Sequence, residues 1–271
     1  MKVSIIIPVY FNEDNLRPLY DDLKAKVLDK IDYEIVMVDD GSGDASFEVM
    51  KELSEKDSNI LIYKLSRNFG SHAAILCGLD HCTGDCAVVK AADLQEPSEI
   101  ILDMVEEWKN GNNVVLALRE SRNESGRQVA FADMYYEIVR KAALHNMPKH
   151  GFDVYLIDRK VIDVLSKLDE RNSALTGQIL WSGFKTGYVY YVRKAREIGK
   201  SRWTLKKKMR LVMDTLFSFS SLPITVIETV GVLSFLFAAI WAIVEVVFKI
   251  TGVVTVEGWT LLFIFSLLLE H

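Results

Sequence analysis

Cysteine, proline and histidine are scarce in this sequence, with three, five and five residues in a chain of 271. The cysteines Cys77, Cys82 and Cys86 form neither a disulfide framework nor paired CxxC metal ligands, so we expect buried thiols in a reducing compartment. Glycine-rich loops of the two standard phosphate-binding spacings are absent, which argues against P-loop hydrolases and Rossmann dehydrogenases. No cleavable signal peptide is expected, because Lys2-Val3-Ser4-Ile5 already begins a strand, and this places the N-terminal domain in the cytosol.

Charge and hydropathy are unevenly distributed along the chain. The net charge is -5, which argues against nucleic acid as a partner. From Pro223 onward, Val, Ile, Leu, Phe and Trp dominate, whereas residues 1–220 have the composition of an α/β protein. A basic cluster precedes this apolar region, as expected where a chain meets anionic lipid or phosphate. It consists of Lys200, Arg202, Lys206, Lys207, Lys208 and Arg210.

Short apolar runs alternate with helix-length amphipathic stretches in the N-terminal part. We expect strands at 3–9, 33–38, 60–65, 87–90, 114–118 and 187–192, and helices at 15–28, 45–55 and 158–168. Strands that are apolar throughout and separated by helices are typical of a parallel sheet covered on both faces. In such an α/β fold, ligands bind beyond the carboxyl ends of the strands.

Residues 224–250 are long enough to cross a bilayer, which needs ~20 residues. Glu228 and Glu245 lie near the two ends, where headgroups can solvate them. The alternative is a buried core helix, but a helix that is apolar on all sides needs a very large domain to cover it.

A second apolar segment, 258–269, stops too early to cross, and the final Leu269-Glu270-His271 resembles the start of an expression tag. Residues 205–219 are expected to form an amphipathic helix along the membrane surface. We therefore expect a cytosolic catalytic domain at 1–200, an amphipathic juxtamembrane segment at 201–223, and a transmembrane region at 224–271 whose second span is truncated.

Polar motifs follow several of the expected strands. Asp39-Asp40-Gly41-Ser42 can accept hydrogen bonds from a nucleobase and ribose, although strand-to-helix turns in general favour these residues. Tyr10 could flank a base, Glu13 could begin a helix, and Arg67 is available to a phosphate. Asp93-Leu94-Gln95-Glu96 offers the hard oxygen ligands that Mg²⁺ or Mn²⁺ prefers.

Together these motifs resemble the family 2 glycosyltransferases, and more closely the membrane-anchored polyprenyl-phosphate sugar synthases such as dolichol-phosphate mannose synthase and bactoprenol glucosyltransferase. The resemblance covers essentially the whole chain. It is carried by Pro8-Val9-Tyr10-Phe11-Asn12-Glu13, Val38-Asp39-Asp40-Gly41-Ser42, Arg67-Asn68-Phe69-Gly70, Ala92-Asp93-Leu94-Gln95-Glu96-Pro97, Arg196-Glu197-Ile198-Gly199-Lys200-Ser201-Arg202-Trp203 and Phe219-Ser220-Ser221-Leu222-Pro223.

The resemblance implies a GT-A-type, Rossmann-like fold followed by an amphipathic helix and transmembrane helices. It implies an inverting enzyme that moves a hexose from a nucleotide diphosphate sugar, UDP-glucose or a relative, to undecaprenyl phosphate. It also implies a multi-pass protein of the cell membrane with its catalytic domain on the cytoplasmic face, in contact with membrane lipids, and a homo-oligomer, with a tetramer as the expected form. The nucleotide site would include Pro8, Tyr10, Glu13, Asp39, Asp40, Arg67 and Ala92, and the divalent cation would bind Asp93 and Gln95.

The stretch Gly151-Phe152-Asp153-Val154-Tyr155 resembles the family's Asp-Phe-Arg motif, in which the aspartate is the proposed base. Tyr155 stands where the family has arginine. A lipid phosphate has a second pKa near ~6, so Asp153 either deprotonates the acceptor or only orients it; helix capping is a further alternative. Candidates for the acceptor phosphate are Arg119, Arg122, Arg127, Arg196, Lys200 and Arg202, each of which could instead be a solvated surface charge.

Ala91 replaces the first acid of the family's Asp-Ala-Asp-Leu-Gln motif. Either the chain is a natural variant whose cation shell is completed by water and diphosphate, or the position was altered to silence turnover. The loss also leaves room for a catalytically weak or dead nucleotide-sugar-binding partner. A processive polysaccharide synthase is a further alternative, but Gln178-Ile179-Leu180-Trp181 only faintly matches its Gln-x-x-Arg-Trp motif.

Overall fold

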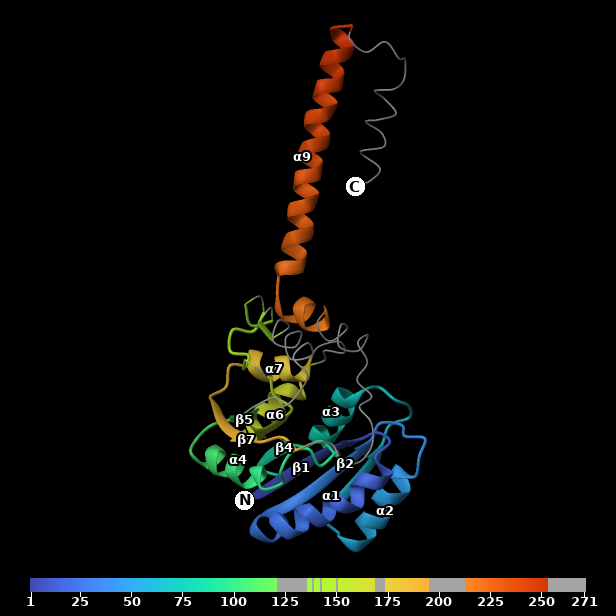
Figure 1. Cartoon of the computed structure of the whole chain (residues 1–271), viewed down its shortest axis with the longest axis vertical. Helices are drawn as coiled ribbons and strands as arrows, with labels where there is room; N and C mark the ends of the chain where they lie inside the picture. Colours follow the sequence, from blue (N-terminus) through green and yellow to red (C-terminus); the bar gives the residue numbers. More distant parts are fainter. Residues whose placement is uncertain are drawn as a thin grey trace. The chain divides into compact units, whose positions relative to one another are not determined.

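The computed structural model describes residues 1–120, 136–137, 139–141, 143–149, 151–168, 174–194 and 213–252. The chain divides into two units, Met1–Phe219 and Ser220–His271, and each is described by itself. Figure 1 shows the elements of both units.

The described part of the first unit contains a seven-stranded sheet in the order β3-β2-β1-β4-β6-β5-β7. The strands are β1 (Lys2–Val9), β2 (Asp32–Asp39), β3 (Ile60–Lys64), β4 (Cys86–Val89), β5 (Val114–Arg119), β6 (Val154–Asp158) and β7 (Thr186–Tyr191). Every pairing is parallel except the two that β6 makes with β4 and β5. The expected mostly parallel α/β sheet is confirmed.

Strand β6 and the helix α7 (Leu175–Trp181) are additions to the expected elements. The helix expected at 158–168 is shorter, Arg159–Leu165, and β6 directly precedes it. Because β6 runs against its neighbours, its first residues lie at the edge where β4 and β5 end.

Helices cover both faces of the sheet (Figure 1). One apolar core includes side chains from α1 (Glu13–Lys26), α2 (Ser46–Lys56) and α4 (Ile100–Lys109). The opposite core includes side chains from α3 (Ser71–His81), α6 (Arg159–Leu165) and α7. Helix α1 shows why a helix packs on the sheet. Leu16, Leu19 and Leu23 recur at helical spacing and are fully buried, while acidic residues occupy its first turn. A short 3₁₀ turn, Leu28–Lys30, follows α1.

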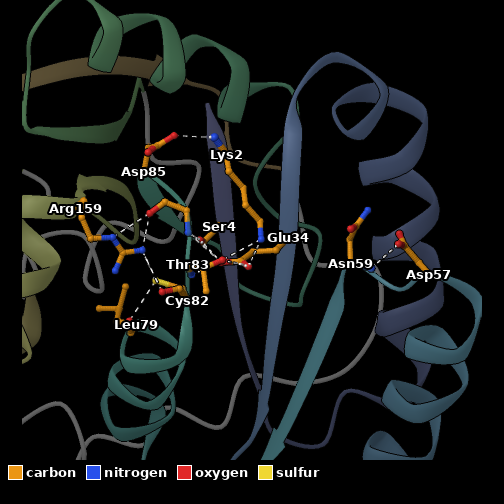
Figure 2. Close-up of polar contacts among 11 residues, drawn as sticks. Lys2, Ser4, Glu34, Asp57, Asn59, Leu79, Cys82, Thr83, Asp85 and Arg159 are labelled. Carbon is orange, nitrogen blue, oxygen red and sulfur yellow. Dashed lines mark hydrogen bonds and ion pairs between the residues drawn. The ribbon is translucent and has the colours of Figure 1, made fainter.

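A buried carboxylate ties together the edge of the sheet at which the parallel strands begin (Figure 2). Glu34 of β2 is 2% exposed and accepts hydrogen bonds from Ser4 Oγ at 2.6 Å and Thr83 Oγ1 at 2.8 Å. Lys2 Nζ lies 2.6 Å from Glu34 Oε2, the oxygen that also accepts from Thr83. A side chain at Gly84 would collide with Ser4 Oγ at 2.5 Å, so this turn requires glycine. The cluster joins β1, β2 and the turn before β4.

The second unit contains helix α9, Leu222–Ile250, with 29 residues. Among the residues that the structure describes, it is the one helix long and apolar enough to cross a membrane. Residues 213–219, in the first unit, are helical, which covers the end of the amphipathic helix expected at 205–219. The second apolar segment, 258–269, lies outside the described residues, so the multi-pass arrangement stays a prediction.

We predict that Glu34→Gln lowers the free energy of unfolding at neutral pH by about 3 kcal/mol. Burial opposes ionisation of Glu34, but hydrogen bonds from Lys2, Ser4 and Thr83 outweigh it and lower the pKa to about 2. A carboxylate whose pKa falls on folding stabilises the fold above its unfolded pKa. The difference from wild type should therefore shrink as the pH falls from about 4.5 toward 2. Urea unfolding of the full chain in mild detergent, followed across pH, measures it.

Glu52→Gln is the matched control for this prediction. Glu52 is also ion-paired, with Arg17 and with Lys56 at 2.6 Å, but on the surface, where water screens the charges. Its replacement should change the unfolding free energy far less. Equal losses in the two variants would contradict the role assigned to burial.

Candidate active site

Polar side chains from both halves of the sheet meet along one edge. Six strands are mutually parallel, so their carboxyl ends share this edge, and reversed β6 begins there. The residues that reach it include Tyr10 after β1, Asp40 after β2, Asp93 after β4, Arg119 at the end of β5 and Asp153 before β6. The strand order changes direction at β1, which has β2 on one side and β4 on the other. This is the switch point where α/β sheets bind ligands.

Asp40 holds the loop that leads into α3. Its carboxylate accepts hydrogen bonds from Asn68 Nδ2 at 2.9 Å, Phe69 N at 2.7 Å and Gly70 N at 2.9 Å. Gly41 has φ of +70°, and a Cβ there would lie 2.6 Å from the carbonyl carbon of Arg67. The tight packing of these two loops therefore requires glycine, and Asp40 serves as a structural acceptor between them.

Asp39 is better placed to contact a ligand. Its side chain is fully buried; Oδ1 accepts a hydrogen bond from Ser42 N at 3.0 Å. Oδ2 lies 3.7 Å from Lys64 Nζ and accepts no hydrogen bond from the described residues. A buried acceptor without a donor is unfavourable unless a ligand or water completes it.

The loop after β1 packs against this turn. Phe11 adopts a left-handed φ of 55°, uncommon for a bulky residue, and its amide donates to Ser42 Oγ at 3.0 Å. The rings of Tyr10 and Phe11 contact edge to face at 4.8 Å. Glu13 Oε2 accepts a hydrogen bond from Ala45 N at 2.7 Å, so this carboxylate joins the starts of α1 and α2.

The other expected nucleotide residues lie in different surroundings. The exposed Arg67 stacks over the ring of Phe69, with its Cζ 4.7 Å from the ring centroid, and phosphate binding is a natural use of such a cation. Pro8 lies within β1 and is half-buried. Ala92 is 4% exposed and its methyl group belongs to the core beneath α1 and α4.

The turn after β4 is held by the end of β7. Leu94 has a left-handed φ of 58°, and Asp93 Oδ1 accepts a hydrogen bond from Gln95 N at 3.3 Å. Gln95 Oε1 accepts from Arg193 Nη2 at 2.6 Å, and Gln95 O accepts from Lys194 N at 2.9 Å. The Gln95 side chain is therefore engaged by Arg193, and its expected role as a metal ligand stays a prediction.

Glu96, next in this turn, is 2% exposed, and its Oε2 has no hydrogen-bond partner among the described residues. Burial raises the pKa of Glu96, and the neighbouring charge of Asp93 raises it further, while Lys90 and Arg193 oppose this. Two carboxylates in a partly buried turn create a negative field that favours a cation.

The donor set fits a divalent cation that takes most of its ligands from elsewhere. Among the described residues, no three His, Cys, Asp or Glu side chains form a group that could hold a metal. Asp93, partly exposed beside the orphaned Glu96 oxygen, can supply one hard ligand. Mg²⁺ and Mn²⁺ accept such sites when phosphate and water provide the rest.

Arg119 and Asp153 form an ion pair across β5 and β6, through Nη2 and Oδ2. Arg119 is mostly buried, with 16% of its side chain exposed, whereas Asp153 is 48% exposed. Arg119 Nε also donates to Tyr191 OH at 3.4 Å. Thus the expected acceptor cation and the expected base form one pair. Tyr155 of β6 is 2% exposed, and its hydroxyl has no hydrogen-bond partner among the described residues. The other candidate cations, Arg122, Arg127, Arg196, Lys200 and Arg202, lie outside the described residues.

Arg193 and Lys90 lie at this edge but were not predicted as site residues from the sequence. Arg193 directly follows the strand expected at 187–192, so the rule that ligands bind at strand ends would have found it. Glu96 belongs to the stretch Asp93-Leu94-Gln95-Glu96, which the sequence already marks as a source of oxygen ligands. Lys90 is a charged residue inside an otherwise apolar strand run, which is an unusual position that sequence alone can mark.

The family model for Glycosyl transferase family 2 matches residues 4–156, more than half of the chain. The chain belongs to glycosyl transferase family 2. It is 36% identical to the uncharacterized glycosyltransferase YkcC of Bacillus subtilis (strain 168), over 99% of this chain and 84% of that protein. It is 32% identical to the bactoprenol glucosyl transferase of Shigella phage SfX, over 91% and 83%. The expected family and glycosyltransferase activity are confirmed.

Solved structures confirm the GT-A-like fold of this glycosyltransferase. Glucosyl-3-phosphoglycerate synthase from Mycobacterium tuberculosis, in complex with Mn²⁺ and UDP-glucose, matches with a TM-score of 0.55 at 16% identity, over 78% of this chain and 75% of that one. A mannosyltransferase from Pyrobaculum calidifontis with GDP-mannose and Mn²⁺ matches with a TM-score of 0.54 at 17% identity, over 77% and 60%. At these identities the likeness shows the fold alone.

We predict that Asp153→Asn lowers kcat of this glycosyltransferase on the order of 100-fold at every pH, because the change removes the partner that orients Arg119. The pH profile of the initial rate measures it, with Asp163→Asn, an exposed carboxylate of α6, as control. Recovery of the rate at high pH would show that Asp153 acts as a base instead.

We predict that Mn²⁺ binds this glycosyltransferase weakly alone and more tightly when UDP is present, because the described protein supplies few ligands at the turn. Titration calorimetry with and without UDP measures the difference. Asp93→Asn should remove most of the gain, and tight Mn²⁺ binding without nucleotide would contradict the prediction.

Proposed function

We propose that this protein transfers a hexose, with inversion, from a nucleotide diphosphate sugar to undecaprenyl phosphate, giving a lipid-linked monosaccharide for cell-surface glycan modification. The observation that carries the proposal is the Arg119–Asp153 pair on the same sheet edge as the Asp93 turn. A partly exposed guanidinium beside an acidic turn suits a reaction between two phosphorylated substrates. The bactoprenol glucosyl transferases among the relatives support a polyprenyl acceptor and a glucose donor.

The half of the edge built by β1, β2 and β3 is assigned to the nucleotide. The unsatisfied Oδ2 of Asp39 would accept a hydrogen bond from a base or ribose, and the partly exposed Tyr10 would flank the base. Arg67 would reach a phosphate. Asp40 and Glu13 act indirectly, since they shape the loops that carry these groups.

The diphosphate is assigned to the turn after β4. Asp93 would hold Mg²⁺ or Mn²⁺, which would neutralise charge on the departing diphosphate. Gln95 is held against β7 by Arg193, so in this arrangement it supports the turn from the side. A cation bound through a single carboxylate is consistent with Ala91 as a natural variant.

The acceptor phosphate is assigned to Arg119. An oxygen of the lipid phosphate forms the new bond to the anomeric carbon as the bond to the diphosphate breaks and its electron pair leaves with the nucleotide. Asp153, still paired with Arg119, orients the guanidinium so that its other N–H groups face the arriving phosphate. Burial raises the pKa of Tyr191, so its hydroxyl stays neutral next to Arg119.

Helix α9 is assigned to the membrane. Its length and apolar composition suit a span, and an isoprenoid acceptor requires an enzyme at a bilayer surface. A multi-pass topology with the catalytic domain on the cytoplasmic face, and a homo-oligomer, extend this proposal. The sugar is open, because the fold occurs with UDP-glucose, GDP-mannose and UDP-GlcNAc bound in other enzymes.

We predict that the full chain in detergent, given radiolabelled UDP-glucose, Mn²⁺ and undecaprenyl phosphate, yields label that extracts into organic solvent. Omission of the lipid is the control, and UDP-galactose and UDP-GlcNAc in parallel identify the sugar. Water-insoluble polymer would instead indicate a processive synthase. Nucleotide binding without any product would indicate a catalytically dead partner, the alternative that Ala91 leaves open.

A further inference from the structure

Lys90 is a lysine inside the fold. It directly follows β4, its amide donates to Ile6 O at 3.0 Å, and its side chain is 0% exposed. Burial lowers the pKa of this ammonium, because a charge removed from water loses its solvation. Such a residue persists in a core only where specific partners offset that loss.

The ammonium of Lys90 binds the turn after β4 from its buried side. Its Nζ donates to the main-chain oxygen of Glu96 at 2.7 Å, six residues along the chain. Between the two lie Asp93 and Leu94, and Leu94 has the left-handed φ of 58° that a residue with a Cβ adopts at a cost. A strained turn of this kind keeps its shape only when its surroundings fix it.

The turn is fixed at two consecutive carbonyls. Lys90 binds that of Glu96 from the core, and the amide of Lys194 binds that of Gln95 from the end of β7. Carboxylates surround the buried cation and favour its charged form: Glu96 first, then Asp22, Asp93 and Glu99. Lys90 is thus coupled to Asp93 both through the backbone of the turn and through charge.

We propose that Lys90 is a positioning residue that fixes the turn after β4, so that the carboxylate of Asp93 points at a divalent cation on the donor diphosphate. With alanine at position 91, a single carboxylate serves this purpose, and its direction matters correspondingly more. The inference rests on the proposed function, since it requires a nucleoside diphosphate at this edge. Lys90 itself, fully buried, touches no substrate.

The test is the gain in UDP affinity that Mn²⁺ provides, measured by titration calorimetry on the full chain in detergent. Lys90→Met keeps roughly the length of the side chain and its burial, but removes its charge and its hydrogen-bond donor. We expect Mn²⁺ to bind the UDP-saturated variant roughly 10- to 100-fold more weakly, as for other groups that orient a metal ligand. UDP binding without metal should be unchanged, because the β1–β3 half of the site is intact.

Lys26→Met is the matched control. Lys26 pairs with Asp22 at 2.8 Å and Glu99 at 3.0 Å, two of the acids near Lys90, but lies on the surface and does not touch the turn. It should keep the full Mn²⁺ effect. An equal loss in this variant would assign the effect to general charge and overturn the proposal.

Lys90→Gln, which keeps N–H donors without charge, guards against a Met variant that does not fold. We expect it to retain part of the Mn²⁺ effect. A folded variant that keeps the full Mn²⁺ effect contradicts the role proposed for Lys90. A folded variant that loses UDP binding in the absence of metal contradicts it as well. If neither variant folds, Lys90 supports the core and not the turn, and the proposal is wrong. A wild-type protein that binds no UDP refutes the proposed function first.

Discussion

The active site depends on one reversed strand. Strand β6 is antiparallel to β4 and β5. Asp153, just before β6, therefore lies at the same edge of the sheet as Arg119, the last residue of β5, and the two side chains form an ion pair. Had β6 been parallel, Asp153 would lie at the far edge of the sheet. The Arg119–Asp153 pair then connects, through Tyr191 and the end of β7, to the turn that carries Asp93. Strand direction, more than any single contact, brings together the groups that we propose are catalytic.

The two edges of the sheet differ in how well their polar groups are satisfied. At the edge around Glu34, donors from Ser4, Thr83 and Lys2 surround a single carboxylate. At the opposite edge, Asp39 and Glu96 each retain a buried oxygen that accepts no hydrogen bond from the part of the chain that the structure describes. Phe11 and Leu94, which adopt left-handed φ angles of 55° and 58°, lie at that same edge. The satisfied carboxylate thus lies at one edge of the sheet, and the unmet bonding capacity of the described residues includes the edge that we propose binds substrates.

Much of the fold could be predicted from sequence, because apolar runs such as Val3–Val9 and helix-spaced leucines report burial directly. The positions of Asp93 and Arg119 could be predicted in the same way, because Asp93 comes shortly after one apolar run and Arg119 lies at the end of another. Strand β6 was missed because five residues after a loop give too short a pattern. The contacts of Asp40 were also hidden: its partners Asn68, Phe69 and Gly70 lie 28 to 30 residues away, and sequence does not show which of two adjacent acids holds a distant loop.

The length of helix α9 has a consequence for the lipid environment. At about 1.5 Å per residue, its 29 residues extend about 43 Å, whereas the hydrocarbon layer of a bilayer is about 30 Å thick. A span of this length must tilt, thicken the membrane locally, or leave a turn or more among the headgroups. If α9 spans a membrane as proposed, acyl-chain length would set its tilt, and membrane thickness would tune how readily the proposed polyprenyl acceptor is presented to the enzyme.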